Sequence, residues 1–105
     1  MTSSAKKQAL QRVKEAKRTV LAALRENGEL LNLQELYLFL NQTEDILSMA
    51  VIDEQLANLQ SAQKKLEDIT RRIKEDIEGL EDVAEKVEIA TKAVKGVTDA
   101  FKTIA

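Results

Sequence analysis

Apolar side chains recur every seven residues through the second half of the chain. Most of these positions have a second apolar residue three places further on. The first series is Ile52, Leu59, Leu66, Ile73, Leu80, Val87, Val94 and Phe101, and the second is Ala62, Ile69, Val83, Ala90, Val97 and Ile104. A heptad of this kind gives a helix one continuous apolar face, which must be covered by the same chain or by another.

The first half of the chain predicts two more helices. Residues 4–26 carry one apolar stripe at helical spacing, and Asn27-Gly28 should end this helix because both residues tolerate a left-handed C-cap. Residues 30–52 are again apolar at helical spacing, and Leu31, Leu38 and Phe39 make them apolar on other sides too, which indicates deep burial or a contact surface. Thr43 is placed to cap a restart of the helix after a polar break. We expect burial of Leu36, Leu40, Leu59, Leu66, Ile73, Leu80, Val87 and Val94.

Gly79 leaves two architectures open for the rest of the chain. The heptad stays in phase across it, which favours one long helix, whereas the rarity of very long helices favours a turn. The predicted fold is therefore all-α, a single domain of residues 1–105. It is an antiparallel helical bundle or coiled-coil-like hairpin of three to four helices, completed by the chain alone or by dimerisation. The predicted helices span about 4–26, 30–52, 53–78 and 80–104, with the last two continuous in the alternative.

Composition removes most kinds of chemistry. The chain has no cysteine, histidine, tryptophan or proline. The residues needed for disulfides and for the usual zinc and haem ligand sets are therefore missing. Serine–histidine and cysteine–histidine catalysis are excluded for the same reason. We expect no catalytic residues, no cofactor, no metal site and no enzymatic activity. No apolar run is long enough for a signal peptide or membrane span, so a soluble cytoplasmic protein is expected.

Charge is segregated although the net charge is only −2. Residues 1–25 hold seven Lys or Arg and one acid, whereas residues 26–63 hold seven acids and no Lys or Arg. Lys7, Lys14, Arg18 and Arg25 fall on one line of the first helix and are candidate ligands for nucleic-acid phosphates or anionic lipids. The competing and favoured interpretation is that the basic helix lies against the acidic segment, so that their fields cancel.

The segment ELYLFLNQTED, residues 35–45, has two interpretations. It could open a helix-turn-helix, with Asn41–Thr43 as the turn and Glu44–Leu59 as the recognition helix. That recognition helix would face phosphates with four acids and no base, which disfavours DNA reading. We therefore expect either core or a protein-binding surface here, with Leu36, Tyr37, Phe39 and Leu40 as the candidate contact residues.

These patterns favour a non-catalytic protein–protein association module that most simply forms a homodimer by burying apolar helix surface. Two alternatives remain. One is a peripheral binder of anionic membranes through its amphipathic helices. The other is a nucleic-acid-associated protein that uses the basic line of the first helix.

Overall fold

The computed structural model describes residues 2–104, and the side chains of residues 4–102. Its helices are α1 (Thr2–Glu26), α2 (Leu31–Leu47), α3 (Leu56–Asp76) and α4 (Glu81–Ile104), with a short 3-10 turn, η1 (Asp53–Gln55), before α3. No strand occurs in the described part of the chain. The prediction of an all-α bundle is confirmed.

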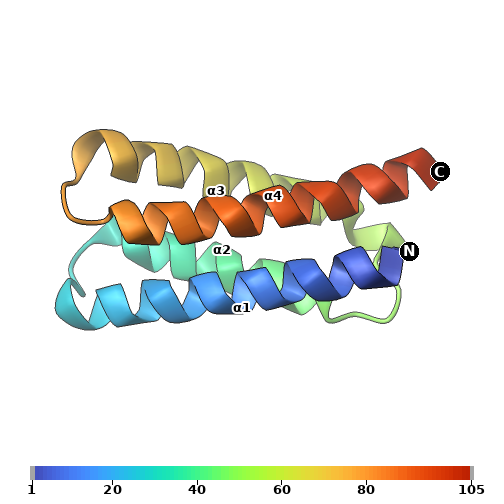
Figure 1. The fold of residues 1–105 in the computed structure, drawn as a ribbon, viewed down its shortest axis with the longest axis horizontal. Coiled ribbons are helices and arrows are strands. Elements are labelled where there is room, and N and C mark those ends of the chain that lie inside the picture. The colour runs from blue at the N-terminus through green and yellow to red at the C-terminus, as the bar shows by residue number, and fades with distance from the viewer. Residues whose placement is uncertain (1, 105) are drawn as a thin grey trace.

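The four helices form an antiparallel bundle in which consecutive helices are neighbours and α4 returns to lie beside α1 (Figure 1). The turns after α1 and α3 lie at one end of the bundle, and the chain ends and the loop after α2 lie at the other (Figure 1). The most extensive helix contact joins α1 to α4. Each helix runs most of the 41 Å length of the molecule. The α1–α2 pair and the α3–α4 pair therefore present opposite faces.

The heptad series forms the centre of this bundle. All of the residues expected to be buried are enclosed by the chain itself, and the most exposed of them, Leu80, is only 7% exposed. Ala62, Ile69, Val83, Ala90 and Val97 are also buried. The side chain of Ile104 lies outside the described residues. Because the chain covers its own heptad face, a second copy is not needed to hide it.

The turns after α1 and α3 are made differently. α1 ends at Glu26 as predicted, but without a left-handed residue, since Gly79 is the one described residue with positive φ. Instead, the backbone N–H and side-chain amide of Asn27 both donate to the carbonyl of Ala23, at 2.9 and 3.3 Å. Gly79 adopts a φ of 88° between α3 and α4. This decides the open question in favour of two helices over one long helix.

The second helix is shorter than the predicted span of residues 30–52. α2 ends at Leu47, and residues 48–52 form a loop in which Val51 is 72% exposed and Ile52 is buried. No local signal marks this end, because residues 46–52 contain no glycine or proline. The chain has to reverse here so that α3 can pack antiparallel to α2.

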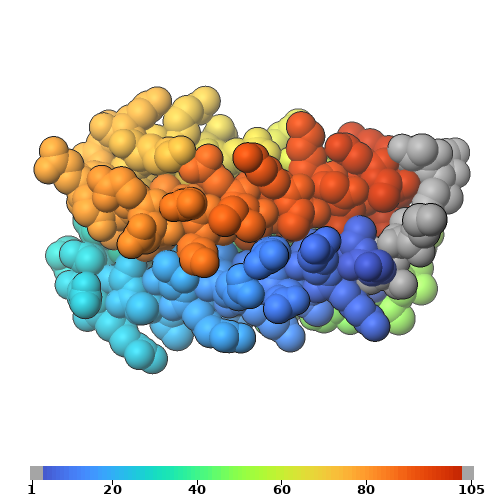
Figure 2. Space-filling view, viewed as in Figure 1, coloured from blue at the N-terminus to red at the C-terminus, as the bar shows by residue number. Residues whose placement is uncertain are grey.

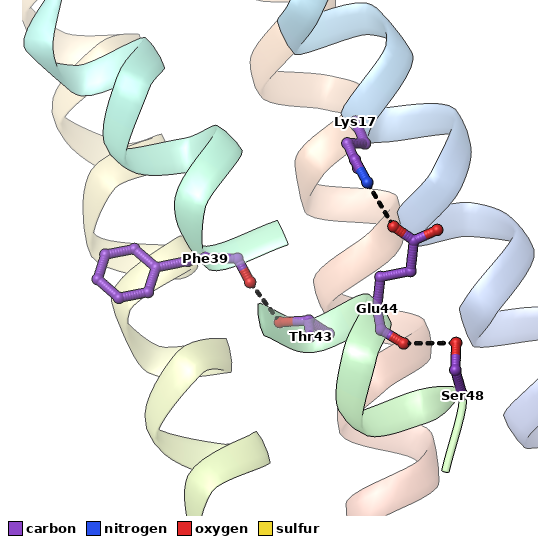
Figure 3. Close-up of polar contacts among 5 residues, drawn as sticks. All are labelled: Lys17, Phe39, Thr43, Glu44 and Ser48. Carbon is purple, nitrogen blue, oxygen red and sulfur yellow. Dashed lines mark hydrogen bonds and ion pairs between the residues drawn. The ribbon is translucent and has the colours of Figure 1, made fainter. Parts of the chain in front are cut away.

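Thr43 does not cap a restart. α2 is continuous through residues 41–43, and the buried Thr43 hydroxyl donates to the Phe39 carbonyl one turn earlier, at 2.8 Å (Figure 3). A threonine whose hydroxyl donates to a carbonyl one turn earlier lies within a helix and does not cap the start of one. The turn that a helix-turn-helix needs at Asn41–Thr43 is therefore absent.

Candidate functional site

One ion pair joins the basic first helix to the acidic second one. The Lys17 ammonium lies 2.5 Å from a Glu44 carboxylate oxygen, and both side chains are three-quarters or more buried (Figure 3). The same ammonium lies 5.7 Å from the centre of the Tyr37 ring. The hydrogen bond to Glu44 raises the pKa of Lys17 above its ordinary value. Lys17 therefore stays charged at neutral pH and fastens α1 to α2.

The basic line of α1 lies outside this contact. Lys7, Lys14, Arg18 and Arg25 are all exposed, and among the described side chains none of them forms an ion pair. Lys14 and Arg18 line a small hollow of about 230 Å³ between α1 and α2, together with Leu21 and Glu44. The two helices are adjacent, as the internal interpretation of the charge requires, yet among the described side chains Lys17 alone forms an ion pair between them. The four residues of the line remain available to an anionic partner.

The candidate contact residues of ELYLFL divide into two groups. Leu36 and Leu40 are fully buried in the core, which leaves them no part in a contact with another chain. Tyr37 and Phe39 are half-buried on opposite flanks of α2. Tyr37 lies under Lys17 of α1, and the Phe39 ring lies 4.9 Å from the ammonium of Lys65 on α3.

The outward face of α2 instead exposes two leucines that were not among the predicted contact residues. Leu31 is 65% exposed and Leu38 is 60% exposed, and they are seven residues apart on the same helix face. The sequence shows them as apolar residues on a side other than that of Leu33, Leu36 and Leu40, where deep burial and a contact surface were both open. The structure leaves them exposed.

Exposed apolar side chains gather in the first half of the chain. Among the described residues, five of the six large apolar side chains that are exposed lie between residues 21 and 51, and only Ile89 belongs to the α3–α4 half. The five are Leu21, Leu31, Leu38, Met49 and Val51. Clustered exposed apolar residues mark contact surfaces more often than scattered ones do.

The α3–α4 pair carries a different feature, a polar groove. Gln63, Thr70, Thr91 and Thr98 are the buried polar residues of this pair, and they line hollows between the two helices. The central hollow has a volume of about 420 Å³. The Lys74 ammonium crosses the groove to a carboxylate oxygen of Glu88 at 2.6 Å.

Two other kinds of site find no support in the described residues. No group of three or more acidic side chains there is arranged to hold a metal ion. No helix in residues 2–104 has both the length and the apolar character to cross a bilayer.

Comparisons of this chain with protein-family models, with curated proteins and with solved structures found no significant match.

Proposed function

We propose that this protein is a non-catalytic association module that pairs with a second copy of itself through the α1–α2 face. The observation that carries the proposal is the concentration of exposed apolar side chains on one half of the molecule, with Leu31 and Leu38 on the outward side of α2. The described part of the chain leaves more than half of each of these leucines exposed. Burying both between two copies would remove apolar surface from water on each side of the contact.

The face is large enough for a stable dimer. The molecule is 41 Å long and 18–21 Å across. One long side therefore offers an area close to the roughly 800 Å² per partner that standard protein interfaces bury. A two-fold contact along this side is the commonest way for identical subunits to pair.

Charge on the α1–α2 face suits such a pairing. The exposed cations Lys7, Lys14, Arg18 and Arg25 lie on α1, and the acids Glu35 and Asp45 lie on α2 beside the leucines. A two-fold axis running between the helices would set α1 of each copy over α2 of the other. The basic line of one copy would then meet the acidic helix of its partner, which favours this register over one with like charges opposed.

Sedimentation equilibrium of the purified chain between about 1 µM and about 1 mM tests the proposal, because this range covers ordinary dimer affinities. We expect a concentration-dependent dimer in the unchanged protein. The double variant Leu31→Gln with Leu38→Gln should weaken it by about tenfold or more, which corresponds to the loss of two buried leucine contacts. Ile89→Gln is the matched control, since it removes an exposed apolar side chain from the other half.

A particle that stays monomeric across the whole range would overturn the proposal, as would equal weakening by the double variant and the control. If the monomer instead bound nucleic acid or anionic vesicles in a salt-sensitive way, the basic line of α1 would become the leading site. Charge reversal by Lys14→Glu with Arg18→Glu would then abolish that binding.

A further inference from the structure

A trough runs between α3 and α4 on the side of the bundle opposite to α1–α2. It consists of the central hollow of about 420 Å³ and a second hollow of about 360 Å³ nearer the chain ends. Glu67 and Lys95 line both hollows, so the two lie next to each other along the helices. The trough belongs to a surface that the proposed dimer does not use.

The trough is strongly cationic. Its lining carries six basic side chains, Lys64, Arg71, Lys74, Lys92, Lys95 and Lys102, and three acidic ones, Glu67, Glu88 and Asp99. Glu88 pairs with Lys74 at 2.6 Å, and Glu67 accepts a hydrogen bond from Gln63 at 3.0 Å. Among the described side chains, Lys92 and Lys95 form no ion pair.

Two cations on different helices meet in the central hollow. The Lys74–Glu88 pair sets the antiparallel register, and one turn further along each helix brings Arg71 level with Thr91 and Lys92. Arg71 has one partner, Asp68, at 3.3 Å, and both of these side chains are more than half exposed. Like charges that share a hollow repel each other. An anion bound between them would attract both cations and offset this repulsion.

The floor of the trough adds hydrogen-bond acceptors. The hydroxyls of Thr70, Thr91 and Thr98 donate to carbonyls of their own helices, at 2.6, 2.9 and 2.9 Å. Each hydroxyl has one donor proton, so its oxygen keeps lone pairs. Thr70 and Thr91 are 3% and 5% exposed, against 1% for Thr98, so these two are the ones that an outside donor can reach. The floor therefore suits a ligand with N–H groups, and the rim suits a ligand with negative charges.

A polypeptide with acidic side chains has both kinds of group along its length. The lined part of the trough covers residues 60–74 of α3 and 88–102 of α4, which is about 20 Å at the rise of an α-helix. An extended segment of about six residues has the same length. We propose that the α3–α4 trough binds an extended acidic peptide segment of another protein, with its backbone N–H groups toward the threonines and its carboxylates on Arg71, Lys92 and Lys95.

Fluorescence anisotropy of a labelled octaglutamate peptide with the full chain tests this inference, with octaglutamine as the uncharged probe. We expect the full chain to bind octaglutamate at low salt, and rising salt to weaken that binding. The double variant Lys92→Gln with Lys95→Gln should weaken binding by about tenfold, as expected for the loss of two charge contacts. Lys86→Gln, which removes an exposed lysine from another side of α4, should leave it unchanged. Thr91→Leu keeps every charge but narrows the central hollow and removes a hydroxyl from its floor, and it should weaken binding as well.

Several results would overturn the inference: no binding of octaglutamate, equal binding of octaglutamine, or equal weakening by Lys86→Gln. Binding that survives in Thr91→Leu would assign the affinity to diffuse surface charge and not to the trough. Vesicles of anionic phospholipid and inorganic phosphate are tested in parallel, and capture of either one without octaglutamate would contradict a peptide ligand. The dimer variants Leu31→Gln and Leu38→Gln should not alter peptide binding, so failure of one proposal leaves the other standing.

Discussion

The two helices that flank α4 meet it through different kinds of side chain. The flank of α4 that carries Glu88 faces α3, so the opposite flank, with Ala90 and Ala93, faces α1. On α1, Lys17 marks the flank toward α2, and Ala9 and Ala16 lie on the side toward α4. Ala9, Ala16 and Ala90 are completely buried, and in the space-filling view α1 and α4 meet along the length of the molecule (Figure 2).

The α3–α4 interface also has a buried alanine, Ala84, on the flank of α4 that carries Glu88, but it adds threonine and glutamine. Thr70, Thr91, Thr98 and Gln63 are buried there, and hollows remain above them. Small apolar side chains let two helix backbones approach closely, whereas branched polar ones with long charged neighbours hold the outer edges of the helices apart. The comparison teaches that the residues beside the core, and not the heptad core itself, decide whether a pair of helices closes or leaves a groove.

The largest expected effect tests whether the core under the trough is as tightly packed as the rest. Leu66 is fully buried on α3, in the layer beneath the trough. Leu66→Ala should lower the free energy of unfolding by about 2–5 kcal/mol, because it leaves a cavity in an enclosed site. Urea denaturation measures this loss. A loss below about 1 kcal/mol would mean that the looseness of the α3–α4 pair reaches into the core, since collapsible sites lose least.

The next prediction compares the two interfaces directly by placing the same side chain in each. Ala16→Leu should lower the free energy of unfolding by about 1–3 kcal/mol, because the close α1–α4 contact has no room for the larger side chain. Thr91→Leu should change it by less than about 1 kcal/mol, because the added carbons enter the hollow. Thermal unfolding of both variants under one set of conditions makes the comparison. Equal losses would contradict the distinction between a closed and an open interface.

The smallest effect concerns the ion pair that crosses the trough. The side chains of Lys74 and Glu88 are 52% and 39% exposed, so water screens their attraction. Lys74→Gln should change the free energy of unfolding by less than about 0.5 kcal/mol, as is usual for surface ion pairs. Chemical denaturation in low and high salt measures this change. A loss well above 1 kcal/mol would mean that the ion pair, and not the core, holds α3 to α4.

The sequence by itself determined the helical fold and its core. The heptad positions from Leu59 to Val94 are buried as predicted, because a seven-residue repeat of apolar side chains permits only one helix face to leave water. It also marked Asn27-Gly28 and Gly79 as the places where the chain could turn. The charge segregation and the alignment of the four basic residues along α1 also follow from the sequence, since both depend only on spacing along the chain.

The tertiary structure alone decided how these helices end and what they leave exposed. An unbroken heptad is compatible with one long helix or with two, and only packing against α1 and α2 selects the turn at Gly79. The end of α2 at Leu47 has no local signal, because it follows from the reversal that brings α3 beside α2. The neighbour that covers each helix flank decides which side chains are buried. It accounts for the burial of Leu36 and Leu40, the exposure of Leu31 and Leu38, and the trough over Thr70 and Thr91. Which flank of a helix is covered depends on the assembled bundle, so the periodicity along one helix cannot predict it.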